Sequence, residues 1–189
     1  MRRVSSPREP RLRRVENPER GGVQVSTNLL LLADTHVPKR AKRLPDSVLS
    51  AVEEADIVVH AGDWVDVATL DLLTSRSRAL VGVFGNNDGP ELRARLPEIA
   101  RVRVEGVDIA VIHETGAAKG REQRMELAFP DADVLVFGHS HIPWDTASPS
   151  GLRLLNPGSP TDRRRQPVCT MMSVTIDGSR IEATLVPVR

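Results

Sequence analysis

The chain has very few aromatic residues and a single cysteine. Among its 189 residues are no tyrosine, three phenylalanines and two tryptophans, so the core has to be built mainly from Leu, Val, Ile and Ala. One cysteine, Cys169, excludes an internal disulfide, and we expect a cytoplasmic protein. No segment approaches the roughly 20 consecutive apolar residues of a membrane-spanning helix. The basic N-terminus is not followed by the apolar stretch of a secretory signal, so we expect no membrane association.

The positive and negative charges nearly balance. The sequence has 26 Lys and Arg against 25 Asp and Glu, which gives no indication of a nucleic-acid partner. Residues 1–24, however, are rich in Arg and contain little that can be buried. We predict that they form a disordered or loosely ordered Arg-rich arm and that residues 25–189 form one domain. The arm could contact RNA or an acidic surface, although a solvated tail is the simpler interpretation.

Short apolar segments alternate with amphipathic ones in the first half of this domain. Three apolar segments that end in polar residues are predicted strands, at residues 25–34, 56–63 and 79–86. Residues 45–55 and 66–76, between them, have the apolar spacing of helices. This alternation predicts an α/β fold with parallel strands connected by helices.

The second half is richer in predicted strands. They lie at residues 101–114 (two strands around a turn), 133–138, 152–158, 168–177 and 180–188. Asp177-Gly178 predicts a hairpin turn between the last two strands. A helix is expected at about 118–129, and residues 88–98 and 142–150 are expected to be loops that shape the walls of a pocket.

Side chains that can bind metals follow five of the predicted strands. They are Asp34, His36, Asp63, Asn86, His113, His139 and His141. Ligands of open α/β sheets bind outside the carboxyl ends of the strands, so these residues are predicted to converge. In the segment GHSH, the alternation of a strand predicts that His139 and His141 point to the same face.

The number of these residues indicates two metal ions. One ion binds about four to six oxygen and nitrogen ligands, and seven side chains suit two ions that share a bridging carboxylate. Two cations about 3.5–4 Å apart can bind a phosphate and hold a hydroxide between them.

Six short segments, in this order, resemble the motif series of the calcineurin-like metallophosphoesterases. They are LADTH (32–36), HAGDW (60–64), GNND (85–88), VIH (111–113), GHSH (138–141) and NPGS (156–159). Over residues 27–188 the chain is similar to the small bacterial and archaeal phosphodiesterase branch that is related to the retromer subunit Vps29. The resemblance implies a four-layer α/β/β/α sandwich of two mixed β-sheets flanked by helices.

The resemblance also implies a role for each residue. The first metal would be held by Asp34, His36, Asp63 and His141, and the second by Asp63, Asn86, His113 and His139. Asp63 would therefore bridge two divalent ions, and a hydroxide between them would attack the phosphorus of a phosphodiester. Asn86 and Asn87 would stabilise the charge of the transition state. A ligand set of oxygen and nitrogen atoms without thiolate allows manganese, iron, nickel, cobalt or zinc, and manganese is the ion that we expect.

Two positions depart from the pattern of much of the superfamily. Asn87 stands where many members have a histidine that is often proposed to protonate the leaving group. An amide can donate a hydrogen bond but cannot be a general acid, which favours leaving groups that need little protonation. Glu114 stands where many members have glycine; it could orient an imidazole or narrow the entrance, and we expect it to face solvent.

Two other features have no role in this series. His60 could support a metal ligand from behind or simply pack in the core. Arg163, Arg164 and Arg165 could bind a substrate phosphate, but a run of charge in a loop is more often solvated.

The main prediction is therefore a phosphodiesterase that acts on a small-molecule or nucleotide phosphodiester. A catalytically weak binding scaffold like Vps29 is one alternative, although all seven ligand positions are filled here. A nuclease that holds nucleic acid with the basic arm is another. A homodimer is compatible with the sequence.

Overall fold

The apolar segment near the start of the domain forms the central strand of a five-stranded sheet. In the computed structural model, which describes residues 26–189, this strand is β1 (Thr27–Leu32), and it pairs in parallel with β2 (Ile57–His60). β3 (Leu80–Gly82) continues the sheet in parallel, and the hairpin of β9 (Thr170–Asp177) and β10 (Arg180–Pro187) completes it on the other side. The strand order is β10-β9-β1-β2-β3.

A second five-stranded sheet packs against the first. It has the order β4-β5-β6-β8-β7, formed by β4 (Ala100–Val104), β5 (Val107–Val111), β6 (Val134–Val136), β8 (Arg153–Asn156) and β7 (Trp144–Ala147). β5, β6 and β8 run parallel to one another, and β4 and β7 are antiparallel edge strands. The core between the sheets is aliphatic, with Leu29 and Leu31 from one sheet and Ile109 and Val136 from the other.

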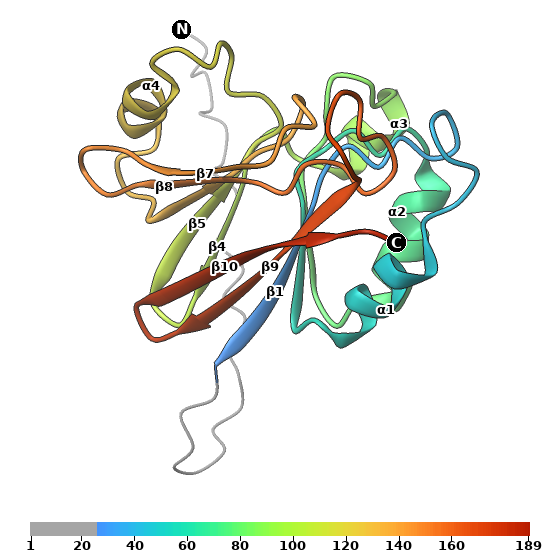
Figure 1. Cartoon of the computed structure of the whole chain (residues 1–189), viewed down its shortest axis with the longest axis horizontal. Helices are drawn as coiled ribbons and strands as arrows, with labels where there is room; N and C mark the ends of the chain where they lie inside the picture. Colours follow the sequence, from blue (N-terminus) through green and yellow to red (C-terminus); the bar gives the residue numbers. More distant parts are fainter. Residues whose placement is uncertain (1–25) are drawn as a thin grey trace, which may run out of the picture.

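Helices cover the outer faces of both sheets (Figure 1). α1 (Asp46–Glu54), α2 (Val67–Arg76) and α3 (Pro90–Arg95) lie on the first sheet. They bury Val48, Leu73 and Leu92 in the same cluster as Leu30 and Leu32 of β1, because successive side chains of a strand point to opposite faces. α4 (Arg121–Ala128) lies on the outer face of the second sheet. The predicted four-layer α/β/β/α sandwich is confirmed.

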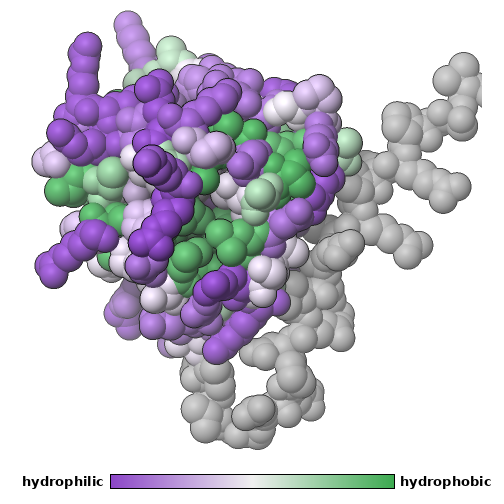
Figure 2. All heavy atoms as spheres, turned by 90° about the vertical axis from the view of Figure 1, so that its right-hand side faces the viewer, coloured by the Kyte–Doolittle hydropathy of each residue, from purple (hydrophilic) through white to green (hydrophobic). Residues whose placement is uncertain are grey.

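The surface over α1 and α2 is partly apolar. Figure 2 shows this side of the molecule, where apolar surface forms a patch that hydrophilic side chains surround. Leu49 of α1 and Val186 and Val188 near the C-terminus pack against the helix-side core while remaining partly exposed. The helical layer therefore leaves some of its apolar side chains at the surface.

Most of the predicted elements are present, with three corrections. Residues 88–98 and 142–150 are not wholly loops, because they contain α3 and β7. The helix predicted at 118–129 is shorter and spans Arg121–Ala128. In the final hairpin, Asp177 still pairs with Arg180, so the connecting residues are 178 and 179 instead of 177 and 178.

The predicted Arg-rich arm lies outside the described residues. Within residues 26–189, no helix has both the length and the apolar character that crossing a membrane requires.

Candidate metal centre

The seven predicted ligand residues all lie in loops at the carboxyl ends of β1, β2, β3, β5 and β6. They are Asp34, His36, Asp63, Asn86, His113, His139 and His141. Backbone hydrogen bonds join neighbouring loops, from Asp34 N to Gly62 O at 2.9 Å and from Gly138 N to His113 O at 3.0 Å. Because the parallel strands of both sheets end at the same rim, the structure brings these residues together.

The backbone at five of these residues is left-handed, with φ between 45° and 68°; they are Asp34, His36, Asp63, His139 and His141. Such a conformation costs a non-glycine residue on the order of 1–3 kcal/mol and is concentrated at functional sites. For GHSH it corrects our prediction, because the segment follows β6 and does not extend it. His139 and His141 accordingly face different neighbours instead of sharing one strand face.

One group of side chains gathers around Asp34. The Nε2 atom of His141 lies 3.5 Å and that of His36 3.8 Å from Asp34 Oδ1. The two Nε2 atoms are 3.2 Å apart. The other ring nitrogen of His141, Nδ1, lies 2.7 Å from the carbonyl oxygen of Asp162, which can only accept a hydrogen bond. His141 Nε2 therefore carries the free lone pair and faces the group.

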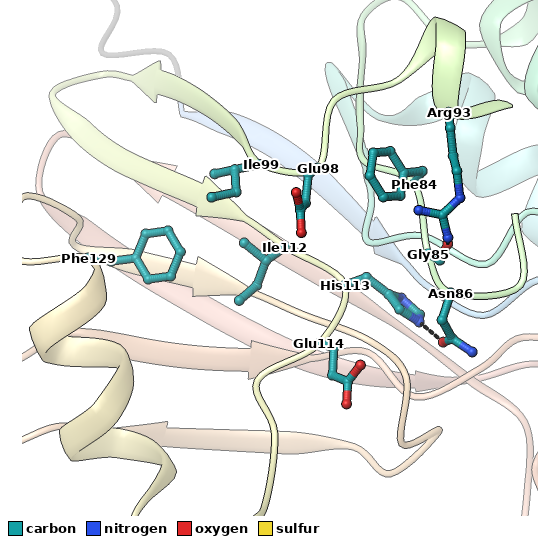
Figure 3. A pocket seen from close by; sticks show the side chains of 10 residues that line it. All are labelled: Phe84, Gly85, Asn86, Arg93, Glu98, Ile99, Ile112, His113, Glu114 and Phe129. Carbon is teal, nitrogen blue, oxygen red and sulfur yellow. Dashed lines mark hydrogen bonds between the residues drawn. The ribbon is translucent and has the colours of Figure 1, made fainter. Parts of the chain in front are cut away.

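A second group gathers around Asn86. Its Oδ1 atom lies 2.9 Å from His113 Nε2 (Figure 3). The same Oδ1 atom lies 2.9 Å from His139 Nδ1. His113 Nδ1 lies 2.7 Å from the carbonyl oxygen of Ala61, which fixes the proton on Nδ1 and leaves Nε2 unprotonated in the neutral ring. The second group thus presents ligand atoms toward one point, as the first does.

Asp63 lies between the two groups. Its Oδ2 is 3.5 Å from His36 Nε2, and its Oδ1 is 3.5 Å from His113 Nε2. The backbone N–H and the side-chain amide of Asn87 donate to the same carboxylate, at 2.8 Å and 2.6 Å. This position suits a bridging ligand, and it shows that Asn87 holds Asp63 in place, a contact that sequence reasoning did not find.

The donor set fits a cation. Both carboxylate oxygens of Asp34 are buried and have no hydrogen-bond partner among the described residues. An unpaired buried carboxylate is costly, and a cation would satisfy it. Ligand atoms of Asp34, His36 and His141, and of Asp34, Asp63 and His113, lie within 4.8 Å of one another. Buried Asp and His groups of this kind are typical metal ligands.

Burial controls the protonation of these groups. Burial raises the pKa of Asp34 to about 8, and it lowers the pKa of His141 to about 4 and that of His36 below its usual value. Burial alone would also raise the pKa of Asp63, but the nearby His113 ring and the hydrogen bonds from Asn87 hold this pKa well below its usual range. Burial alone would lower the pKa of His113, yet the nearby carboxylate of Asp63 raises it. Asp63 is therefore the carboxylate that is charged without a metal.

Asp88 is a buried residue that supports the site without facing it. Its Oδ2 accepts hydrogen bonds from the backbone N–H groups of Asp63, at 3.1 Å, and Gly85, at 2.7 Å. Its Oδ1 accepts one from Val65 at 2.7 Å. Asp88 therefore joins the loops after β2 and β3. Its position at the end of a predicted strand was visible in the sequence, but its role required the loop backbone.

The NPGS segment performs a similar task between β8 and β9. Ser159 Oγ donates to the backbone oxygen of Asp34 at 2.7 Å, and Asn156 Nδ2 donates to that of Gly138 at 2.8 Å. Asp162 N donates to Ser159 Oγ at 2.9 Å. The segment thus positions the loops that carry Asp34 and GHSH.

His60 lies behind the ligand loops. Its Nδ1 accepts the N–H of Gly62 at 3.2 Å, its Nε2 lies 3.2 Å from Thr35 Oγ1, and its ring stacks on Trp64 at 3.6 Å. Burial lowers its pKa to about 3, so the ring is neutral. His60 therefore packs between two ligand loops.

Glu114 and Arg164 lie at the rim of the site. Glu114 is about half exposed, and its Oε1 lies 3.8 Å from His139 Nε2. Arg164 is exposed and its Nη1 lies 3.4 Å from the backbone oxygen of His139. Arg163 and Arg165 are also exposed, and Arg163 donates to Gln166 O within the same loop. Of the three arginines, Arg164 is thus the one with a contact to a ligand residue.

Comparison with known proteins gives a consistent result. Residues 28–179 match the family model of the calcineurin-like phosphoesterase superfamily domain. A Methanocaldococcus jannaschii protein named a probable metallophosphoesterase is 32% identical over 161 residues, which cover 84% of this chain and 80% of that protein.

Solved structures share the fold. The solution NMR structure of a Thermotoga maritima protein has a TM-score of 0.69 and 36% identity, covering 86% of this chain and 99% of that one. Wild-type Vps29 of Entamoeba histolytica, solved in complex with zinc, has a TM-score of 0.67 and 22% identity, covering 85% of this chain and 98% of that one, and its likeness concerns the fold alone. On the family match and the 32% identity to the archaeal relative, the chain belongs to the calcineurin-like phosphoesterase superfamily.

Proposed function

We propose that this metallophosphoesterase hydrolyses phosphodiesters with two divalent cations at the rim of its sheets. The observation that carries the proposal is the buried, unpartnered carboxylate of Asp34, which faces two histidines beside a second group around Asn86. Asp34, His36, Asp63 and His141 would hold one cation, and Asp63, Asn86, His113 and His139 the other. When bound, two such cations polarise the phosphoryl oxygens and lower the pKa of a water molecule between them.

The amide side chains next to the ligands supply the polar contacts. Asn86 Oδ1 faces His113 (Figure 3) and His139, which leaves the Asn86 Nδ2 group available to donate to a phosphoryl oxygen. Asn87 donates to both oxygens of Asp63, so we propose that it acts mainly by fixing that carboxylate. Its direct contact with the transition state stays a prediction. The guanidinium of Arg164, at the rim, can bind a phosphate that enters the site.

One feature bears on the leaving group of the substrate, and another favours a diester over a monoester. Asn87 has no proton to give to a leaving group, which suits esters of acidic alcohols. Glu114, at the rim and beside His139, places a carboxylate where the second negative charge of a monoester would be repelled. Manganese is our proposed ion, and the zinc bound by Entamoeba histolytica Vps29 supports a place for zinc among the alternatives.

Metal content and substrate preference together test this proposal. We expect protein purified without chelator to contain divalent metal by mass spectrometry. It should hydrolyse bis(4-nitrophenyl) phosphate with a higher kcat/KM than 4-nitrophenyl phosphate when supplied with manganese, iron, nickel, cobalt or zinc. EDTA should abolish the activity. Protein that binds no metal and hydrolyses neither ester would instead support the scaffold function.

Asp63→Asn tests the bridging position. Because the amide cannot supply two anionic oxygens, we expect this variant to bind less metal and to lose at least about 100-fold in kcat. Asp71→Asn is the control, since Asp71 is exposed and pairs with Arg95 at the surface, at 2.6 Å. An Asp63→Asn variant with two metals per chain and full turnover would contradict the proposal.

A further inference from the structure

A pocket opens beside the second group of ligands. Its volume is about 300 Å³, and Asn86 and His113 form one end of it. From there it extends along the edge of the second sheet (Figure 3). The remaining side chains around it include Phe84, Glu98, Ile99, Ile112, Glu114 and Phe129. Its size is at the lower end of pockets that bind small molecules, which suits one ring system next to a phosphate.

Apolar side chains form part of the pocket walls away from the ligands. Phe84 and Phe129 are two of only five Phe and Trp residues in the chain, and both line this pocket. Ile99 is 46% exposed, so a large part of this aliphatic side chain faces the pocket region without being covered. Phe129 itself is buried, with the Arg101 guanidinium 5.4 Å from its ring centre, so the accessible apolar surface comes mainly from Ile99 and the partly exposed Phe84. An aromatic ring that covered these two side chains would gain burial.

The charged groups around the pocket disfavour an anion. Among the lining residues, Glu98 and Glu114 bring two carboxylates and Arg93 brings one cation, while Arg101 lies behind the lining, over the Phe129 ring. The Arg93 guanidinium lies 4.3 Å from the centre of the Phe84 ring and donates to the backbone oxygens of Asp88 and Gly85, at 2.8 Å each. The Arg93 guanidinium is therefore already engaged by backbone oxygens and by the Phe84 ring, which it holds in place. The two carboxylates accept hydrogen bonds, so they favour a ring that carries N–H groups and no negative charge.

We propose that this pocket binds one ester arm of the phosphodiester, and that this arm is an uncharged aromatic ring such as the base of a nucleoside. The inference rests on the proposed function, because the arm reaches the pocket when the phosphate lies at Asn86 and His113. It goes further in naming the chemistry of the substrate and the residues that select it.

Three diesters with the same nitrophenolate leaving group test the inference. They are methyl 4-nitrophenyl phosphate, bis(4-nitrophenyl) phosphate and thymidine 5′-(4-nitrophenyl phosphate). We expect Ile99→Glu, which removes the aliphatic wall and adds a third carboxylate, to lower kcat/KM about tenfold for diesters whose aromatic arm occupies the pocket. If kcat/KM decreases only for the last two substrates, the pocket binds the ester arm that stays on the phosphate. If it decreases for all three, the pocket binds the nitrophenyl arm that leaves.

Leu185→Glu is the matched control. Leu185 lies on β10, is 42% exposed and does not line the pocket. This variant should keep the wild-type kcat/KM for all three substrates. Thermal unfolding of both variants shows whether either change disturbs the fold.

Binding to the metal-free protein separates the inference from the proposed function. We expect saturation-transfer NMR to detect uridine on wild type and on Leu185→Glu, with a much weaker signal on Ile99→Glu. Orotidine, which adds only a carboxylate to the same nucleoside, should bind more weakly than uridine. If uridine binds in this way but no diester is hydrolysed, the proposed function fails and the pocket assignment stands. If the diesters are hydrolysed while Ile99→Glu matches wild type and uridine does not bind, the pocket assignment is overturned alone.

Discussion

At the scale of single residues, the position of Asp63 depends on Gly85, because the two residues are in close contact. A Cβ atom added to Gly85 would lie 2.2 Å from Asp63 Oδ1 and 2.4 Å from Asp63 N, closer than such atoms can approach. Gly85 N also donates to Asp88, so its backbone cannot move away without losing that bond. The position of the Asp63 carboxylate therefore requires a residue without a side chain at position 85.

Gly85→Ala is therefore expected to displace Asp63 and to weaken metal binding by at least about tenfold, because the ligand geometry would be disturbed. Titration calorimetry with manganese measures this effect. Gly89→Ala is the control, since no atom lies within 4 Å of a Cβ atom at that position. Equal manganese affinity for Gly85→Ala and wild type would show that the loop after β3 can accommodate the methyl group without displacing Asp63.

At the scale of elements, the segments with clear apolar periodicity were predictable. β1, β2 and β6 are short and buried, and α1 and α2 bury regularly spaced residues. α3 has six residues with one buried side chain, Leu92, so no periodic signal exists. β7 is an edge strand without a buried residue. Its sequence therefore lacks the alternation of apolar and polar residues that identifies a strand.

The candidate site was predictable in its membership but not in its geometry. Residue types at strand ends identified the seven side chains, because parallel strands direct their carboxyl ends to one rim. The left-handed residues His139 and His141 follow Gly138, whose N–H bonds to His113 O in a loop far away in the sequence. Local patterns do not encode that bond, and the supporting roles of Asp88 and Ser159 were missed for the same reason.

The segment between β8 and β9 makes an element-scale prediction. Ser159 is buried and bonds to both Asp34 O and Asp162 N. Ser159→Ala removes the acceptor of the partly buried Asp162 N–H and leaves Asp34 O with only the longer hydrogen bond from Thr161 Oγ1, at 3.4 Å. We expect a loss of about 1–3 kcal/mol in the free energy of unfolding, measured by urea denaturation, together with weaker metal binding. Ser179→Ala, in the exposed hairpin turn, should change neither. If Ser159→Ala has wild-type stability, other contacts must hold the Asp34 loop in place.

At the scale of the whole molecule, the site couples protonation to the stability of the packed sheets. The pKa of Asp34 is about 8 in the fold against an ordinary value of 3.8. Between these values the folded chain keeps a proton that the unfolded chain has released, so the free energy of unfolding falls as pH rises, by up to about 1.4 kcal/mol per pH unit. The lowered pKa values of His36 and His141 make the free energy of unfolding rise with pH. This effect is confined to the range below about pH 6.5, where histidine in the unfolded chain takes up a proton. The raised pKa of His113 acts in the same direction as that of Asp34.

The metal-free protein should therefore lose stability between about pH 7 and about pH 8. We expect its Tm, measured after EDTA treatment, to fall across this interval. The increase in Tm on adding manganese should grow over the same interval, because the metal requires the ionised form of Asp34. Asp34→Asn, which has no proton to lose at this position, should show a smaller pH dependence of Tm without metal. A metal-free Tm that rises toward pH 8, or an equal slope in Asp34→Asn, would mean that Asp34 is already ionised at neutral pH and that another group compensates its charge.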